Sequence, residues 1–348
     1  MASIKSSVAF AVLVAATPAM AQNWPAKPVT MVVPYAAGGT TDVVGRIFSQ
    51  RLSEILGQQV IVENIGGAGG MTGASRVAKA APDGYQFVLG NVGTHAQNQT
   101  LYKSPLYNAA TDFAPVALLV DQPMVLTARN DLPADNLQEF MAYAKANQAK
   151  MQYGSAGAGA PTHLSCALLN AAIGIKVTHV PYRGGGPALQ DLIAGRIDYF
   201  CYNAPGAIPQ IEGKTIKAIA ILTKNRSPAL PNLASAQEQG LKDFEADNWL
   251  AFFFPKGTPA AIVQKLHDAA VATIDTAAVR ERLKELGADP VAPERQSPEY
   301  LQKFVEGQIT KWAAAIRAAG VSADLRTGLA DCAVAQHIGR VLSLPPWE

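Results

Sequence analysis

The sequence has few charged residues, few aromatic residues and almost no net charge. Of its 348 residues, 16% are charged and 7% are aromatic, and the net charge at pH 7 is +2. A strongly basic surface of the kind that binds nucleic acid is therefore not expected. With 49% hydrophobic residues, the chain also lacks the composition of a disordered protein. We expect a globular protein with room for two compact domains.

Long hydrophobic segments are also missing. Beyond the N-terminus, no apolar run approaches the roughly 20 residues that a membrane-spanning helix needs. Residues Met1–Ala21 combine a positive Lys5, a short apolar stretch Val8–Ala16 and the small-residue triplet Ala19–Ala21. This pattern predicts an export signal that is cleaved after Ala21, and a buried N-terminal helix is the alternative. We therefore expect the mature protein to be periplasmic.

Cysteine is scarce, and the chain contains only Cys166, Cys201 and Cys332. None of them belongs to a Cys-x-x-Cys motif or a Cys/His cluster, so no metal site is predicted. In an oxidising compartment Cys166 and Cys201 are a candidate disulfide, and two buried free thiols are the alternative. Cys332 lies in a C-terminal tail, apart from the other two.

Common catalytic and nucleotide-binding motifs are absent. The sequence has no Gly-x-x-x-x-Gly-Lys-Ser/Thr, no Gly-x-Ser-x-Gly and no His-Glu-x-x-His motif. The segment Gly67–Gly73 is one residue out of step with the dinucleotide fingerprint, and we expect no cofactor. His163 follows Ser155 and Thr162 closely, which leaves an exported hydrolase open as an alternative. A role in orienting a ligand or capping a helix is the favoured interpretation.

Strand-like and helix-like segments alternate along the chain, which predicts α/β layers with mostly parallel sheets. The expected strands are Val29–Pro34, Val60–Val62, Gln86–Gly90, Met151–Gly154, Val177–Val180, Asp198–Tyr202 and Ile216–Leu222. The expected helices are Val43–Leu56, Met71–Ala80, Asn136–Gln148, Thr162–Ala172, Pro187–Ala194, Ala260–Ile274, Thr276–Leu286 and Pro298–Ala319.

Four glycine-rich turns each connect a predicted strand to a predicted helix. They are Ala36–Thr41, Ile65–Gly73, Ser155–Thr162 and Arg183–Pro187. In a parallel sheet such turns lie at one edge, where helix N-termini present free N–H groups that attract anions. Two turns belong to each half of the chain, so two facing lobes would share a cleft that binds a small anion. The alternative is that the glycines only permit tight turns.

Several ordered motifs carry a resemblance to a known family. They read VPYAAGGTTD, ENIGGAGGMTGA, APDGY, GSAGAGAPTHL, VTHVPYRGGGPALQDLIAGRID, RSPALPNLASAQEQGL and FFFPKGTP. From Trp24 to about Asp324 the chain closely resembles the Bug-type extracytoplasmic solute receptors, the substrate-binding proteins of the tripartite tricarboxylate transporter family. The resemblance implies a two-lobe periplasmic binding protein of the Venus-flytrap kind (type II-like), with flanking helices on each sheet. It also implies a monomer that binds a small organic acid and serves a two-component membrane permease.

Ligand-binding residues are expected in both lobes, most of them as the resemblance implies, with Tyr35, Tyr182 and Tyr202 as candidate stacking surfaces for an aromatic acid. In the first lobe they are Tyr35, Ala37, Gly38, Gly39, Asp42, Asn64, Ala68, Gly69, Thr94 and Asn98. In the second lobe they are Ser155, Gly157, Thr162, His163, Tyr182, Arg183, Gly184, Tyr202 and Asn203. Arg183 is either a partner of the ligand carboxylate or a solvated charge on the rim. We expect the ligand to be captured by closure of the cleft, held mainly by backbone amides.

The expected boundaries follow from the same reasoning. The first lobe comprises residues 22–125 and 224–324, the second lobe residues 126–223, and the segments Val125–Ala128 and Ile219–Thr223 cross between them. The tail Leu325–Glu348 continues no pattern of the family. A receptor that feeds a sensor kinase instead of a permease is a further alternative.

One departure from the family pattern affects the ligand. Tyr202 stands where family members often carry an acidic residue, which could pair with a ligand ammonium group. A phenol supplies no such charge, so a dicarboxylate or an aromatic carboxylate is favoured over an amino acid. The alternative is that Tyr202 only packs in the interior.

Overall fold

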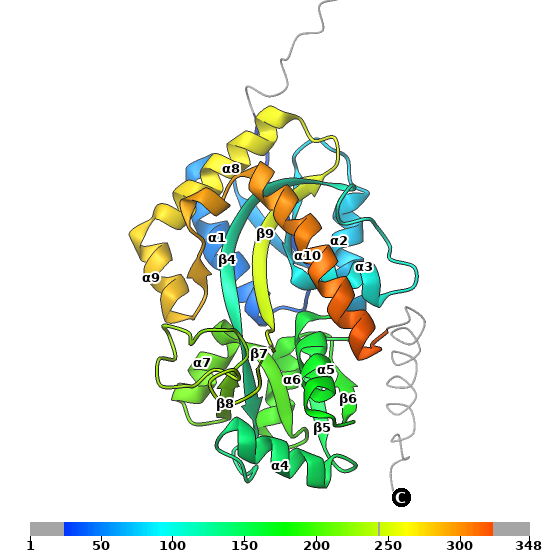
Figure 1. Ribbon diagram of the computed structural model, residues 1–348. Coiled ribbons are helices and arrows are strands. Elements are labelled where there is room, and N and C mark those ends of the chain that lie inside the picture. The colour runs from blue at the N-terminus through cyan, green and yellow to red at the C-terminus, as the bar shows by residue number, and fades with distance from the viewer. Residues whose placement is uncertain (1–23, 243, 323–348) are drawn as a thin grey trace, which may run out of the picture.

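The protein consists of two lobes joined by long strands (Figure 1). The computed structural model describes residues 24–242 and 244–322. The predicted export signal, residues 1–21, and the tail 325–348 with Cys332 lie outside the described residues. The two-lobe α/β architecture expected from the sequence is confirmed.

The first lobe contains a parallel trio of strands extended by antiparallel ones. Their order is β2 (Val60–Asn64), β1 (Val29–Val33), β3 (Gln86–Asn91), β9 (Asp247–Pro255) and β4 (Phe113–Ala128), with β10 (Asp289–Pro290) also paired to β4. The first three strands are parallel, and β9 is antiparallel to both of its neighbours. The sequence reasoning assigned no strand to β9 or β10 and only the end of β4, Val125–Ala128, so the antiparallel part of the first lobe's sheet was missed.

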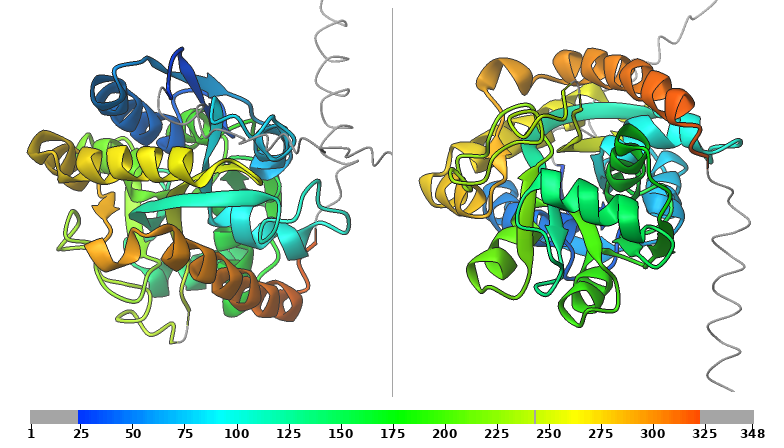
Figure 2. Two further views of the ribbon diagram at one scale, coloured as in Figure 1. Left: turned by 90° about the horizontal axis from the view of Figure 1, so that it is seen from above. Right: turned by 60° about the horizontal axis from the view of Figure 1, so that its bottom comes forward.

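Helices cover both faces of this sheet because its strands are apolar on both sides. One face carries α1 (Thr40–Leu56), α8 (Ala260–Asp275) and α9 (Ala277–Glu285). The other carries α2 (Met71–Ala78), α3 (Asn98–Leu101), α10 (Pro298–Ala319) and the helical turns Ala68–Gly70 and Gly93–Gln97. Viewed from above, α8 and α10 lie on opposite sides of β4 (Figure 2). Along β9, Phe252 and Phe254 join one core and Phe253 the other, as the two-residue period of a strand requires.

The second lobe repeats the plan on a smaller scale. Its sheet has the order β8 (Lys217–Ile221), β4, β7 (Tyr199–Asn203), β5 (Gln152–Ser155) and β6 (Thr178–Pro181). The strands β7, β5 and β6 are parallel. The helices α4 (Leu137–Asn147) and α5 (Pro161–Ile173) cover one face, and α6 (Gly185–Ile193) and α7 (Ala204–Glu212) cover the other.

One strand, β4, belongs to both sheets. Its residues Phe113–Pro123 pair with β9, and from Met124 to Ala128 it pairs with β7 and β8 on opposite edges. The change of partner therefore lies between Pro123 and Met124, next to the expected crossing segment Val125–Ala128.

The chain returns to the first lobe later than the sequence reasoning expected. The proline-rich passage stays on the second lobe, since Leu230 and Leu233 pack against one of its cores and Phe244 belongs to the other. The expected crossing at Ile219–Thr223 instead overlaps β8, and the return begins at Asp247 with β9. The physical reason is that the apolar side chains of this passage are buried in the second lobe. The passage is therefore part of that lobe and not a linker between the lobes.

A disulfide joins Cys166 of α5 to Cys201 of β7, which confirms the predicted pairing. The Cα atoms are 5.4 Å apart. The bond ties a helix directly to the central strand of the second lobe. In the described part of the chain, no helix combines the length and apolar character needed to cross a bilayer.

Candidate functional site

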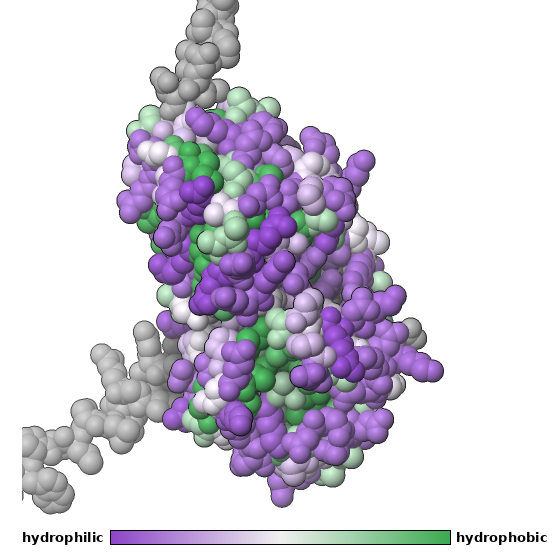
Figure 3. Space-filling view, turned by 90° about the vertical axis from the view of Figure 1, so that its left-hand side faces the viewer, coloured by the Kyte–Doolittle hydropathy of each residue, from purple (hydrophilic) through white to green (hydrophobic). Residues whose placement is uncertain are grey.

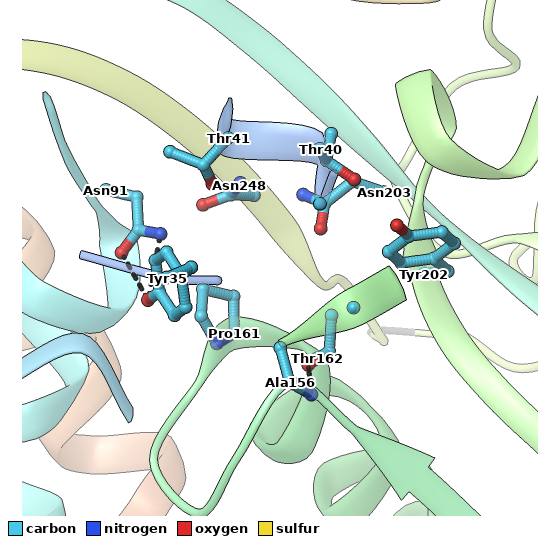
Figure 4. A pocket seen from close by; sticks show the side chains of 12 residues that line it. Tyr35, Thr40, Thr41, Asn91, Ala156, Pro161, Thr162, Tyr202, Asn203 and Asn248 are labelled. Atoms are coloured by element: carbon cyan, nitrogen blue, oxygen red, sulfur yellow. Dashed lines mark hydrogen bonds between the residues drawn. The ribbon is translucent and has the colours of Figure 1, made fainter. Parts of the chain in front are cut away.

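A small pocket lies between the two lobes. Its lining residues are Tyr35, Gly39, Thr40, Thr41, Asn91, Ala156, Pro161, Thr162, Gly185, Tyr202, Asn203 and Asn248 (Figure 4). The list draws on both lobes and on the crossing strand β9. Among the residues that the structure describes, no side chain that lines this pocket carries a charge. Any preference for ions must therefore come from the backbone and from polar groups.

Four helix N-termini converge on the pocket. Helix α1 begins at Thr40, α5 at Pro161 and α6 at Gly185, and Asn203 is the residue before the first turn of α7. Each N-terminus carries about half a positive charge, spread over backbone N–H groups without helical partners. Together they create a positive potential in a pocket that contains no cationic side chain, which suits a small anion.

The first turn is held in shape by a buried carboxylate. Asp42 accepts hydrogen bonds from the backbone N–H of Gly38 at 2.9 Å, from Asn64 Nδ2 at 2.9 Å and from Arg46 Nε at 3.0 Å. Burial alone would raise the pKa of Asp42, but the bonds from Arg46, Gly38 and Asn64 outweigh it and hold the pKa below its usual value. Asp42 is thus a fixed anion that shapes the turn and does not line the pocket.

Tyr35 at the end of β1 connects this turn to its neighbours. Its hydroxyl donates to the carbonyl oxygen of Gly69 at 3.1 Å and accepts from Asn91 Nδ2 at 3.0 Å. Burial raises the pKa of Tyr35, so the phenol stays neutral. The ring lines the pocket while its polar end joins the first and second turns and β3.

Two histidines of the second lobe stack on each other, and His163 is buried and neutral. His163 Nδ1 accepts from the backbone N–H of Gly159 at 3.3 Å, and its ring stacks on His179 with centroids 4.2 Å apart. Burial lowers the pKa of His163 to about 4. Ser155 Oγ lies 2.7 Å from His179 Nε2, so the histidine that pairs with this serine is His179 and not the His163 of the hydrolase alternative.

The turns of the two lobes touch one another. Tyr102 of the first lobe donates a hydrogen bond of 2.7 Å to the carbonyl oxygen of Ala158 in the second. The backbone of Gly69 lies so close to Ala158 and Gly159 that a Cβ atom there would come within 2.6 Å of the Ala158 oxygen. Through these contacts the turns of the two lobes meet directly beside the pocket.

Tyr202 also bridges the lobes. It is 3% exposed, its ring stacks on Phe200 with centroids 4.5 Å apart, and its hydroxyl faces Thr40 at the start of α1. Burial raises the pKa of Tyr202, although the Thr40 hydroxyl and amide counteract this in part. The phenol thus lines the pocket as a neutral group.

The predicted site residues fall into two groups in the structure. Those that line the pocket are Tyr35, Gly39, Thr162, Tyr202 and Asn203. Those on the surrounding turns, without lining it, are Ala37, Gly38, Asp42, Asn64, Ala68, Gly69, Thr94, Asn98, Ser155, Gly157, His163, Tyr182, Arg183 and Gly184. Within this second group, Tyr182 donates to Asp191 at 2.6 Å and Arg183 is exposed.

Seven lining residues were not among the ligand-binding residues assigned from the sequence, although five of them lie in the predicted turns. They are Thr40, Thr41, Asn91, Ala156, Pro161, Gly185 and Asn248. Most of them lie next to a predicted residue in one of the turns. Their position at the start of a predicted helix could have identified them as part of the site. Asn248 had no such signal, because it lies on β9, a strand that the sequence pattern did not reveal.

A second hollow lies on the second lobe alone. Hydrophobic side chains gather on the face that carries α7 and β8 (Figure 3). A groove of about 660 Å³ there is lined by Ile211 of α7, Ala218 of β8, and Leu230 and Leu233 among others. It receives nothing from the first lobe, so it differs in kind from the pocket between the lobes.

Comparison with known proteins agrees with this geometry. Residues 44–321 match the family described as "Tripartite tricarboxylate transporter family receptor". The chain belongs to this family. The resemblance to Bug-type receptors that the sequence motifs carry is therefore confirmed, and the chain is a solute-binding receptor.

Three solved structures of periplasmic or related binding proteins are similar to this receptor. The periplasmic binding protein BugD is 40% identical with a TM-score of 0.83, covering 86% of this chain and 99% of its own. MatC from Rhodopseudomonas palustris with bound malate is 39% identical with a TM-score of 0.82, covering 84% and 100%. An R. palustris protein with adipate is 35% identical with a TM-score of 0.82, covering 86% and 99%.

Proposed function

We propose that this receptor captures a small organic acid in the periplasm, with a dicarboxylate favoured, and delivers it to a tripartite tricarboxylate-type membrane permease. The observation that carries the proposal is the meeting of four helix N-termini from both lobes at a pocket whose described lining side chains are all uncharged. Such a pocket attracts anions through backbone N–H groups. The malate and adipate of two similar structures support a dicarboxylate.

Capture occurs by closure of the lobes around the ligand. One carboxylate binds at the turn before α1 and the other groups bridge to the starts of α5 and α6. The ligand stabilises the closed arrangement by the difference between its binding free energies for the closed and the open arrangement. The hinge lies in β4 and β9, with the first lobe formed by residues 24–123 and 247–322 and the second by residues 124–242 and 244–246. No bond is made or broken, and the monomer presents its closed shape to the permease.

The first test is ligand binding by the mature chain that begins after Ala21. Malate, succinate, adipate, citrate, benzoate and aspartate are compared by thermal shift and calorimetry. A bound ligand at 100 times its Kd stabilises the folded state by about 2.7 kcal/mol. We expect a dicarboxylate to give the largest shift and benzoate, as an aromatic acid, a smaller one. The absence of heat and of any shift with every acid would overturn the proposal.

The second test addresses delivery. Membrane vesicles that contain the two-component permease should accumulate the labelled acid only when the receptor is added. Uptake that is independent of the receptor would contradict delivery to a permease, and ligand-dependent activation of a sensor kinase would support the signalling alternative. Recovery of the ligand unchanged after long incubation, checked by NMR, tests the absence of catalysis.

A further inference from the structure

Three buried amide side chains meet where the crossing strands change partners. Gln122 of β4 pairs in register with Asn248 of β9, and Asn203 ends β7 opposite Met124. The three amides are 1%, 3% and 6% exposed, in the order Gln122, Asn248 and Asn203. Asn203 and Asn248 both line the pocket between the lobes. The cluster of Gln122, Asn203 and Asn248, here called the amide cluster, therefore joins both crossing strands, the second lobe and the pocket.

The hydrogen bonds within the amide cluster fix which atoms remain for a ligand. Asn248 Nδ2 donates to Gln122 Oε1 at 2.8 Å, and Asn203 Nδ2 donates to the same oxygen at 3.4 Å. A carbonyl oxygen only accepts, so both asparagines must turn their NH₂ groups toward Gln122. The Oδ1 atoms of both asparagines are thereby directed away from Gln122.

Asn248 Oδ1 is a buried acceptor without a hydrogen-bond partner among the described residues. Figure 4 shows the Asn248 side chain beside Asn203 in the pocket, with its oxygen on the side away from Asn203. Buried acceptors are costly to leave unpaired, which predicts that the bound ligand brings a donor to this place.

The kind of donor follows from the charges around the pocket. A ligand ammonium group is held most strongly by a carboxylate, and no side chain that lines the pocket is one among the described residues. A hydroxyl group is neutral and matches an amide oxygen as a donor. We infer that Asn248 determines specificity by accepting a hydrogen bond from the hydroxyl group of a hydroxylated dicarboxylate. The inference rests on the proposed capture of an organic acid.

Gln122 acts through Asn248 and is a positioning residue. Its Oε1 holds the Asn248 amide in the orientation that presents Oδ1 to the ligand. A glutamate in its place keeps an acceptor for both asparagines, whereas a methionine of similar length keeps none. The hydroxyl preference should therefore survive Gln122→Glu and be lost in Gln122→Met.

The experiment compares malate with succinate, which has the same carbon chain and no hydroxyl. Calorimetry on the wild type should show malate bound about 3- to 10-fold more tightly, as expected for one neutral hydrogen bond. Asn248→Leu should abolish this ratio, so that malate and succinate bind the variant with equal affinity. Asn170→Leu is the matched control, since Asn170 is a buried asparagine that accepts from Tyr199 in the core of the second lobe. It should keep the malate preference.

Each other outcome overturns the inference in a distinguishable way. Equal wild-type affinity for malate and succinate, or a preference that persists in Asn248→Leu, contradicts the hydroxyl contact but leaves acid capture intact. If no acid binds the wild type, the proposed function fails as well. Should Asn248→Leu not fold, the wild-type ratio and the pair of Gln122 variants still decide the matter.

Discussion

A Cβ atom on Gly69 of the first lobe would lie 2.5 Å from the carbonyl carbon of Gly159 in the second. The two turns can meet only because this position has no side chain. Gly69 also has a φ of +61°, which favours glycine. The contact therefore belongs to the closed arrangement and not to the fold of either lobe alone.

Gly69→Ala should hold the cleft open without unfolding either lobe. We expect the Kd for the bound acid to rise at least about tenfold, equivalent to about 1.4 kcal/mol. Gly57→Ala is the matched control, because Gly57 has a φ of +66° and nothing within 4 Å of a Cβ atom. Calorimetry measures affinity, and small-angle scattering measures compaction on binding. Equal affinities of the two variants would contradict this role for Gly69.

Replacement of Asp42 by asparagine should loosen the first turn. The variant loses the anion that accepts from Gly38, Asn64 and Arg46, so we expect the free energy of unfolding to fall by about 1–3 kcal/mol. Ligand affinity should fall too, because the turn backbone lines the pocket. Asp275→Asn serves as the control, since its ion pair with Arg280 is exposed and should contribute under about 1 kcal/mol. Chemical denaturation provides the comparison.

Loss of the Cys166–Cys201 disulfide should destabilise the second lobe. The bond closes a loop of 35 residues, for which chain entropy predicts about 3–4 kcal/mol. Replacing both cysteines by alanine should lower the denaturation midpoint accordingly. A reducing agent should destabilise the wild type and leave the double variant unchanged. A wild type indifferent to reduction would show that the bond contributes no stability.

Buried histidines should make the protein less stable in acid. Burial lowers the pKa of His163 from 6.5 to about 4, so in this interval the unfolded chain binds a proton that the folded one does not. Stability is therefore lost as the pH falls from about 6.5 to about 4, by about 1.4 kcal/mol per pH unit. His163→Gln should reduce the slope of unfolding free energy against pH by one proton. An identical slope in the variant would contradict a neutral, buried His163.

The local features of the fold were predictable from the sequence. Glycines after β-branched runs marked the turns before α1 and α6, and Pro161 at the start of α5 fits the conformation of a first helical turn. The motif resemblance then supplied the lobes and their facing arrangement. These predictions depend on short stretches of chain, where spacing and residue type carry the information.

Features that depend on distant pairing were not predictable. The run Phe252–Phe254 is apolar on both faces, so it has no alternation to identify β9 as a strand, and Asn248 at its start gave no sign of a ligand. Its contact with Gln122 joins residues 126 positions apart. Likewise Asp42 was predicted to contact the ligand, but its carboxylate oxygens accept hydrogen bonds from Gly38 and Asn64. These partners are known only from the folded structure.

The continuity of β4 restricts how such receptors can be recombined. Its residues Met124–Ala128 pair within the sheet of the second lobe, whereas Phe113–Pro123 pair within the sheet of the first lobe. A chimera that exchanges one lobe with that of a relative would need its junction inside the strand β4. No loop lies there to accommodate a difference in strand twist between the two proteins. A new ligand specificity is therefore better engineered in the glycine-rich turns, which can be changed while β4 is kept intact.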